Sequence, residues 1–371
     1  MQDIFITKIK INEVRNIKDF EINLSDNERK HLIITGKNGS GKTSLLENLK
    51  NRLNTSLIHL NKNSEIYLNY KSEFIQEHPL AKSFASGKFI IKFFSARRSS
   101  QFLETKGVNK IEFKKQYKVD ESAGNDFTQH LVNLQFDKLV AKDENNLEGV
   151  KTIDGWFGVF EKELGTLFSE PKLKLVFDRK NYKYQIIENG NPPIDFNGLP
   201  DGYSAVLDVI AELMMRMEEH KTKSYDVQGI VLIDEIETHL HVDLQKKILP
   251  FLTSFFPKIQ FIVTTHSPFV LSSIKNSVIC DLENRIVTED LSGYSYDTIV
   301  ESYFDSNNYS DEFTNKINEY ETLMDKDDLS DIERDKLLDL EIYLESIPKY
   351  WAKEFAAKYQ QIKLKNIGKR K

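Results

Sequence analysis

Apolar residues along this chain recur with two periods, one typical of strands and one typical of helices. Near the start, "HLIIT" (31–35) is an apolar strand, and "SLLENLKNRLNTSL" (44–57) places its leucines at helical spacing. Later the same alternation returns as strand, helix and strand. The predicted strands are 4–14, 20–24, 31–35, 88–95, 229–234 and 259–266, with a hairpin over 172–190, and the predicted helices are 126–168 (with a polar break), 203–220, 241–256 and a charged helical tail from about 310.

Strands that alternate with helices predict an α/β fold with a mixed, mostly parallel central sheet. Ligands of such sheets bind at the carboxyl ends of the strands. Three polar motifs, "TGKNGSGKT", "LIDE" and "TTHS", each begin where an apolar strand stops. We therefore expect the three motifs to meet at one edge of the sheet.

The stretch "GKNGSGKT" (36–43) matches the phosphate-loop pattern G-x-x-x-x-G-K-[ST]. Its glycines let the backbone N–H groups surround phosphate oxygens, and the next helix adds the positive end of its dipole. Lys42 is expected to neutralise phosphate charge, and Thr43 to bind Mg²⁺. The alternative is an ordinary Gly/Ser turn. The expected nucleotide-binding residues are Gly36, Asn38, Gly39, Ser40, Gly41, Lys42, Thr43 and Ser44.

"GIVLIDE" ends a buried strand in two carboxylates. Beside a phosphate loop, Asp234 is expected near Mg²⁺, and Glu235 is expected to act as base toward, or to orient, the water that attacks the γ-phosphate. Without the loop, the pair would be two solvated carboxylates. "FIVTTHSPFV" ends the adjacent strand, so His266 is expected to contact the γ-phosphate, the alternative being a hydrogen-bonded strand-end residue.

His239 and His241 follow "GIVLIDE". If they open a helix, their side chains point about 200° apart, so they cannot bind one metal ion together. Glu237 and His241 could share a helical face, but we do not expect a zinc site. The segment is better interpreted as a loop before the next helix, with one histidine reaching a neighbouring subunit.

Composition narrows the class of protein. The 371 residues are 40% hydrophobic with a net charge of −6, which argues against a wholesale basic nucleic-acid binder without excluding a local patch. One cysteine, Cys280, excludes a disulfide framework. No stretch approaches the roughly 20 apolar residues of a membrane span. We expect a cytoplasmic protein.

The motifs, in this order and spacing, resemble the ABC-type ATPases of the SMC, RecF and OLD kind, and in particular the small bacterial stand-alone ATPases of phage-defence operons. The resemblance covers 1–55 and 196–275 and includes "INEVRNIKDFEINL", "IDEIETHLH", "TTHSPFVL" and "LPDGYSAVLDVIAEL". It implies an ABC-type P-loop fold, ATP and Mg²⁺ as ligands, and a head-to-tail homodimer or higher oligomer with ATP between subunits.

The segment "LPDGYSAVL" departs from the ABC signature Leu-Ser-Gly-Gly, because Pro200 and Asp201 replace its Ser and first Gly. The contact to the opposite γ-phosphate must then come from the Gly202 N–H, Tyr203 or Ser204. No glutamine marks the loop that links ATP to the inserted lobe. Arg97 or Arg98 could substitute, or the pair could be a surface basic cluster.

The expected domains are an ATPase core split over 1–59 and 196–300, an inserted lobe of helices and a hairpin over 60–195, and a helical extension with a basic tail over 301–371. The chain lacks a nuclease motif of its own, so a separate effector, plausibly a nuclease encoded nearby, is the expected partner. Nucleic-acid binding is left open. The helical tail carries apolar residues at helical spacing, and this stripe is expected either to pack on the core or to dock this partner. Its residues are Leu337, Leu338, Leu340, Ile342, Tyr343, Leu344, Trp351, Phe355 and Tyr359.

The sequence thus predicts an ATPase that acts as a sensor or regulator in a defence or DNA-maintenance complex. One alternative is an ATP-gated scaffold with slow turnover, favoured by the altered signature. A second is a RecF-like DNA-repair ATPase. A transporter's nucleotide-binding subunit would share the phosphate loop, but would carry a better signature and no long insertion.

Overall fold

The computed structural model describes residues 3–55, 64–68, 79–98, 101–188, 190–220, 225–296, 298–299, 311–326 and 328–345. The chain divides into two units, Met1–Ile299 and Val300–Lys371. Within the described ranges, every helix is too short or too polar to cross a membrane.

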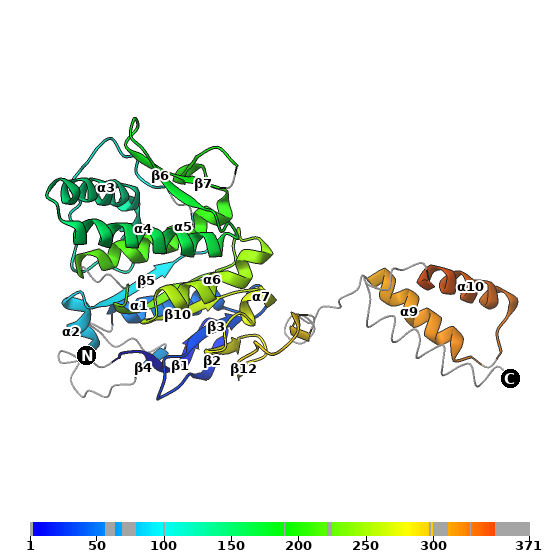
Figure 1. Ribbon diagram of the computed structural model, residues 1–371. Coiled ribbons are helices and arrows are strands. Elements are labelled where there is room, and N and C mark those ends of the chain that lie inside the picture. Colours follow the sequence, from blue (N-terminus) through cyan, green and yellow to red (C-terminus); the bar gives the residue numbers. More distant parts are fainter. Residues whose placement is uncertain are drawn as a thin grey trace. The chain divides into compact units, whose positions relative to one another are not determined.

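A six-stranded sheet forms the centre of the first unit (Figure 1). All neighbouring strands are parallel except the last pair, β11 and β12. The four inner strands are buried along their whole length, as expected for a sheet covered on both faces. The predicted α/β fold is therefore confirmed. In order across the sheet the strands are β12 (Ile286–Glu289), β11 (Ser277–Asp281), β3 (His31–Thr35), β10 (Ile259–Thr264), β9 (Gln228–Ile233) and β5 (Phe89–Phe94).

A small antiparallel sheet packs beside the central one. Its strands are β2 (Ile17–Asn23), β1 (Ile6–Val14) and β4 (Ser64–Leu68). Ile9 and Ile11 of β1 join Leu45 and Leu49 of helix α1 (Lys42–Thr55) in one buried cluster. This packing fixes the start of α1, and with it the end of the phosphate loop.

Helices α5 (Asp201–Met217), α6 (Val242–Phe255) and α7 (Pro268–Leu271) complete the layer near the sheet. In Figure 1, α6 and the sheet lie on one side of α5, and the lobe lies on the other. Helix α5 is buried along most of its length, so it forms the joint between the two parts.

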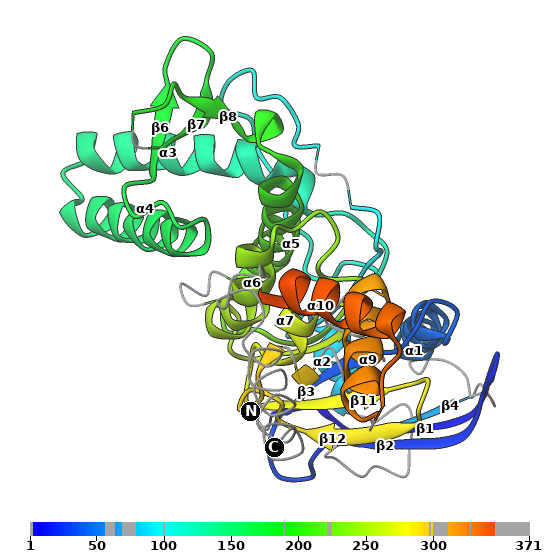
Figure 2. The same ribbon diagram turned by 90° about the vertical axis from the view of Figure 1, so that its right-hand side faces the viewer.

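The lobe consists of two long helices and a three-stranded sheet (Figure 2). Four phenylalanine rings pack together here, with three pairs edge-on and the Phe102–Phe127 pair tilted: Phe102, Phe127, Phe160 and Phe196. The helices are α3 (Phe127–Asp143) and α4 (Leu147–Leu167), and the strands are β6 (Lys174–Asp178), β7 (Lys183–Ile187) and β8 (Ile194–Asp195).

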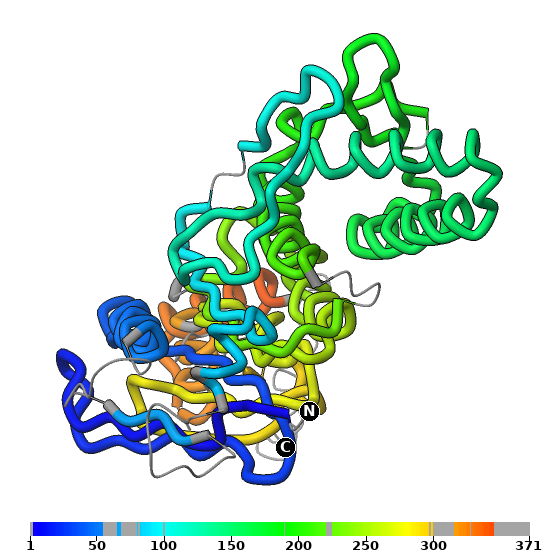
Figure 3. The backbone as a smooth tube through the Cα atoms, turned by 90° about the vertical axis from the view of Figure 1, so that its left-hand side faces the viewer, coloured from blue at the N-terminus to red at the C-terminus, as the bar shows by residue number. Residues whose placement is uncertain are grey.

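The range 60–195, expected for the insertion, is divided differently in the structure. Strand β5 and the preceding helix α2 (Pro79–Ala85) come from that range, yet β5 pairs in parallel with β9 along the edge of the central sheet. Its apolar run "FIIKFF" is buried as an inner-sheet strand would be. The chain then rises alongside α5 to reach the lobe (Figure 3).

The second unit contains a helical hairpin, α9 (Asp311–Met324) and α10 (Asp331–Glu345). The expected single stripe divides into two faces. Leu337, Leu340 and Leu344 are buried against α9, whereas Leu338 and Ile342 are 57% and 60% exposed. Trp351, Phe355 and Tyr359 lie outside the described residues.

Candidate nucleotide-binding site

The phosphate loop connects β3 to α1 with a backbone that only glycine adopts easily. Gly36, Gly39 and Gly41 have φ of +134°, +86° and +103°. A Cβ on Gly36 would lie 2.9 Å from the Ser40 Oγ, and one on Gly41 would lie 3.0 Å from Ile17. The loop therefore curls tightly at the first turn of a helix, the geometry that presents N–H groups to an anion.

The Lys42 ammonium lies inside this curl. It donates to the carbonyl oxygens of Gly36 at 2.7 Å and Lys37 at 3.1 Å. Burial lowers the pKa of Lys42, while the nearby charges of Glu235 and Glu237 act to raise it. A largely desolvated cation at the floor of a curled loop is suited to bind phosphate oxygens.

The other expected loop residues are distributed along the same turn. Asn38 and Gly39 are exposed at the crest, Thr43 is exposed in the first turn of α1, and Ser44 is buried behind it. The Ser40 Oγ is buried and has no hydrogen-bond partner within the described part of the chain. A buried hydroxyl without a partner is rare in proteins, and its position in the loop fits a phosphate ligand.

Asp234 and Glu235 follow the end of β9, and one hydroxyl holds them both. The Thr264 Oγ donates to the Asp234 Oδ1 at 2.6 Å and accepts from the Glu235 N–H at 2.7 Å. Asp234 is buried, and Glu235 is half-buried with φ +44°. Such left-handed backbone in a non-glycine residue is uncommon and clusters at functional sites.

His266 follows the end of β10 and faces the same group of charges. The backbone N–H of His266 donates to the Glu237 Oε1. The buried Nε2 of its imidazole has no partner among the residues that the structure describes. Burial and then the Lys42 charge lower the pKa of His266, so the imidazole is neutral at pH 7. Lys42, Asp234, Glu235 and His266 thus converge, as the motifs predict.

Glu237 is a site residue that the sequence interpretation missed. From the sequence, Glu237 is expected only as a possible partner of His241 in a zinc site. Its Oε1 accepts from the His266 N–H, and its Oε2 is buried with no partner recorded in the described ranges. The available signal was its place two residues after Glu235, inside the same turn.

The structure separates the two candidate arginines. Arg97 is exposed. The Arg98 guanidinium turns inward and donates to the carbonyl oxygens of Asp234, Glu235 and Ile236 at 3.1, 3.0 and 3.2 Å. Arg98 is therefore joined to the strand end that carries the carboxylates.

The expected signature residues lie at the start of α5. A Cβ on Gly202 would lie 2.8 Å from the His239 carbonyl oxygen, so the two segments touch. The Tyr203 ring stacks on Phe168 with centroids 4.1 Å apart, and the Ser204 N–H donates to the Pro200 oxygen at 3.0 Å. The Tyr203 ring is thus engaged within its own chain.

The residues present fit a magnesium ion held by one or two protein ligands better than a metal ion held by protein ligands alone. In the described ranges, no group of three or more His, Cys, Asp or Glu side chains is arranged to hold a metal ion. Magnesium usually takes one or two protein ligands and completes its shell with water and phosphate. Thr43 and Asp234 fit that pattern. His239 and His241 are both exposed.

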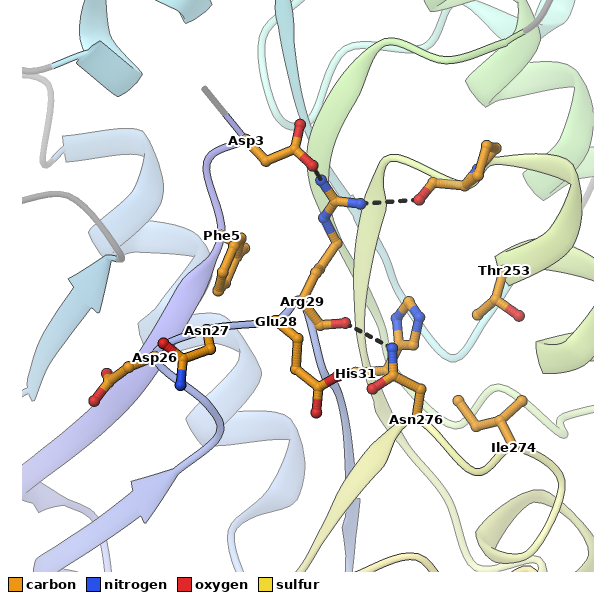
Figure 4. A pocket seen from close by; sticks show the side chains of 11 residues that line it. Asp3, Phe5, Asp26, Asn27, Glu28, Arg29, His31, Thr253, Ile274 and Asn276 are labelled. Carbon is orange, nitrogen blue, oxygen red and sulfur yellow. Dashed lines mark hydrogen bonds and ion pairs between the residues drawn. The ribbon is translucent and has the colours of Figure 1, made fainter. Parts of the chain in front are cut away.

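A cavity of about 740 Å³ lies at the opposite end of the sheet, where β3 and β11 begin (Figure 4). There Arg29 pairs with Asp3 at 3.1 Å and donates to the Pro257 oxygen at 2.9 Å. Asn276 donates to the Arg29 oxygen at 2.9 Å. These contacts fasten the starts of strands to one another.

Comparisons with known proteins support a nucleotide-binding fold. The family described as "AAA domain, putative AbiEii toxin, Type IV TA system" matches residues 109–272, a range that includes Asp234 and His266 but not the phosphate loop. The Septu protein PtuA of Bacillus mycoides (strain KBAB4) is 29% identical over 318 residues, covering 76% of this chain and 41% of that protein. The Retron Ec83 probable ATPase of Escherichia coli is 33% identical over 157 residues, covering 40% of this chain and 29% of that protein.

The chain spans less than half the length of these two relatives. Among solved structures, the SMC head domain from Thermotoga maritima is 13% identical with a TM-score of 0.40, and the match covers 76% of this chain and 97% of that one. The family match and the two relatives confirm the resemblance predicted from the motifs. This chain is similar in sequence to Septu protein PtuA and to the Retron Ec83 probable ATPase.

Proposed function

We propose that the chain binds ATP with Mg²⁺ and hydrolyses it to ADP and phosphate. The observation that carries the proposal is the convergence, at one edge of the sheet, of Lys42, Asp234, Glu235 and His266, which come from three different strand ends. The buried Ser40 Oγ and His266 Nε2, without partners in the described part of the chain, support it. Polar atoms of this kind are expected where a polar ligand completes the site.

Each residue has a distinct role in this proposal. The loop N–H groups and Lys42 bind the β- and γ-phosphates, while Thr43 and Asp234 would hold Mg²⁺, which neutralises the charge that develops in phosphoryl transfer. Glu235 orients the attacking water and accepts its proton. The neutral His266 donates from Nε2 to the γ-phosphate and so distinguishes ATP from ADP.

In the head-to-tail dimer that we propose, ATP lies between the phosphate loop of one subunit and the signature segment of the other. The first turn of α5 carries the N–H groups of Gly202 and Tyr203, and Gly202 touches the His239 segment. Two elements expected at such an interface therefore lie together on one subunit. Because Tyr203 stacks on Phe168 and the Ser204 N–H donates to the Pro200 oxygen, the Gly202 N–H is the group we assign to the opposite γ-phosphate.

The same observations leave a second function, an ATP-gated scaffold with slow turnover. It is favoured by Pro200 and Asp201, which remove the hydroxyl and the glycine of the usual signature. Steady-state turnover at saturating Mg²⁺-ATP separates the two. Sustained turnover, on the order of 1 per second or faster, supports the ATPase. Tight binding with turnover below about one per minute supports the scaffold, and no binding rejects both.

We also propose that this ATPase controls a partner effector in a defence complex. The names of the relatives, Septu protein PtuA and Retron Ec83 probable ATPase, support the setting. Helix α10 supplies a candidate surface, because Leu338 and Ile342 are exposed on it. A plausible effector is a nuclease encoded nearby.

Truncation after Ser310 tests the role of the extension. We expect a folded core that still hydrolyses ATP but no longer retains the proteins that copurify with the full chain. The matched variant is Leu338→Ser with Ile342→Ser, which leaves the buried leucines of the hairpin in place. Retention of every copurifying protein by the truncated core would show that the extension is not the docking site.

A further inference from the structure

The backbone of residues 234–236, the turn after β9, is held by an unusual set of partners. Its three N–H groups bond to neighbouring strand ends: Asp234 to the Phe94 oxygen at 2.9 Å, Glu235 to the Thr264 Oγ at 2.7 Å, and Ile236 to the Thr264 oxygen at 3.0 Å. Its three carbonyl oxygens all accept from one side chain.

That side chain is Arg98. Its Nη1 donates to the Asp234 oxygen, and its Nη2 donates to the oxygens of Glu235 and Ile236, at 3.0 to 3.2 Å. A guanidinium can serve three carbonyls because its donors are held in a rigid planar fork. Loss of this fork would remove the side-chain donor of the Asp234 and Ile236 oxygens, while the Glu235 oxygen would keep the Thr238 N–H at 3.0 Å.

The turn needs this support because its middle residue is strained. Glu235 has φ +44°, and left-handed backbone of this kind costs about 1–3 kcal/mol in a non-glycine residue. A strained residue persists only where its surroundings hold it. The strain falls on the residue whose carboxylate must face the attacking water, so a relaxed turn would redirect that carboxylate.

Arg98 is also coupled to the helix that begins with the signature. Burial lowers the pKa of Arg98, and the charge of Asp208 on α5 is the strongest influence opposing it. On the same helix, Glu212 lies 3.0 Å from the Lys92 ammonium and 2.7 Å from Arg216. A buried ion pair between Glu212 and Lys92 thus joins α5 to strand β5.

From this geometry we propose that Arg98 is a positioning residue, which holds the Glu235 turn in its catalytic conformation. The proposal rests on the proposed ATPase function. The Arg98 guanidinium donates to backbone oxygens of the turn, so in this proposal it places Glu235 and does not bind nucleotide. Its loss should therefore reduce kcat and leave nucleotide affinity nearly unchanged.

The test compares Arg98→Ala and Arg98→Lys with the matched control Arg97→Ala, in the full chain. For each variant, the Kd for Mg²⁺-ATP, kcat, KM and thermal unfolding are measured. We expect Arg98→Ala to lose about 100-fold in kcat, the effect of a displacement near 1 Å, with Kd within about threefold of wild type. Lysine has one point charge and no fork, so Arg98→Lys should recover thermal stability more than kcat.

The neighbouring Arg97→Ala should match the wild type throughout. Wild-type kcat in Arg98→Ala, or a loss of Kd as large as the loss of kcat, would overturn the positioning role while leaving the ATPase intact. Absence of turnover in the wild type and in Arg97→Ala would instead reject the ATPase itself, and this inference with it. A lower melting temperature at unchanged kcat would show a purely structural arginine.

Discussion

The two ends of the central sheet differ in what their polar groups do. At the carboxyl ends, Lys42 is buried among carboxylates, and left-handed backbone occurs at Glu235 and in the glycines of the loop. At the amino ends, Arg29 and Asn276 fasten strand starts around a cavity of about 740 Å³. The difference teaches that convergent buried charge, rather than the volume of a cavity, marks the candidate site.

Removing the Glu235 carboxylate should produce the largest change in turnover. In Glu235→Gln the amide cannot accept the proton of the attacking water, so we expect hydrolysis to fall by about 100- to 10,000-fold, the range of general base catalysis. Mg²⁺-ATP binding should persist, and the trapped nucleotide should accumulate a dimer in light scattering. A monomer with ATP demonstrably bound would contradict the head-to-tail arrangement.

A pair of threonines, one at each end of the sheet, sharpens the comparison. Thr264→Val removes both hydrogen bonds of the hydroxyl that holds Asp234 and Glu235. We expect a loss of about 1–3 kcal/mol in unfolding free energy and about tenfold in turnover. Thr253→Val, beside the other cavity, removes a bond to the Pro250 oxygen and should leave turnover unchanged. Equal kinetic effects in the two variants would erase the distinction between the ends.

At the amino end, His31 should affect stability but not turnover. Burial lowers the pKa of His31 from 6.5 to about 4, and its Nδ1 accepts from the Phe261 N–H. As the pH falls, His31 therefore takes up a proton in the unfolded chain near pH 6.5, but in the folded chain only near pH 4. The stability that His31 contributes above pH 6.5 is lost as the pH falls toward 4. Linkage puts that loss at about 3 kcal/mol.

Denaturant unfolding at several pH values, with wild type and His31→Asn, measures this effect. The asparagine can still accept from Phe261 but does not titrate, so its stability should vary less between pH 6.5 and 4. A variant with the same pH dependence as the wild type would remove His31 as the cause. Turnover at pH 7 should be the same in both.

Much of this carboxyl edge could be predicted from the sequence, because its signals are local. The loop glycines, the strand that ends in Asp234, and the strand that ends before His266 each show in a short stretch of residues. The alternation of strands and helices then places these ends at one edge. Fold class and convergence follow from such patterns without long-range information.

The rest depends on contacts between distant segments. The sequence places strand β5 in the insertion because nothing in "KFIIKFFS" reveals that it pairs with β9, about 140 residues later along the chain. Arg97 and Arg98 are equivalent as neighbours in sequence, and only the fold turns one inward. The tail stripe looked continuous, but its members face both into and out of a two-helix hairpin.

The central claim is that the loop at the carboxyl edge binds nucleotide through Lys42, and calorimetric titration of Mg²⁺-ATP tests it most directly. Lys42→Ala removes the buried ammonium, and Lys37→Ala removes an exposed one from the same loop that pairs with Glu283. We predict no measurable binding in Lys42→Ala, and an affinity within about threefold of wild type in Lys37→Ala, since exposed pairs contribute little. Unchanged affinity in a folded Lys42→Ala would contradict the account.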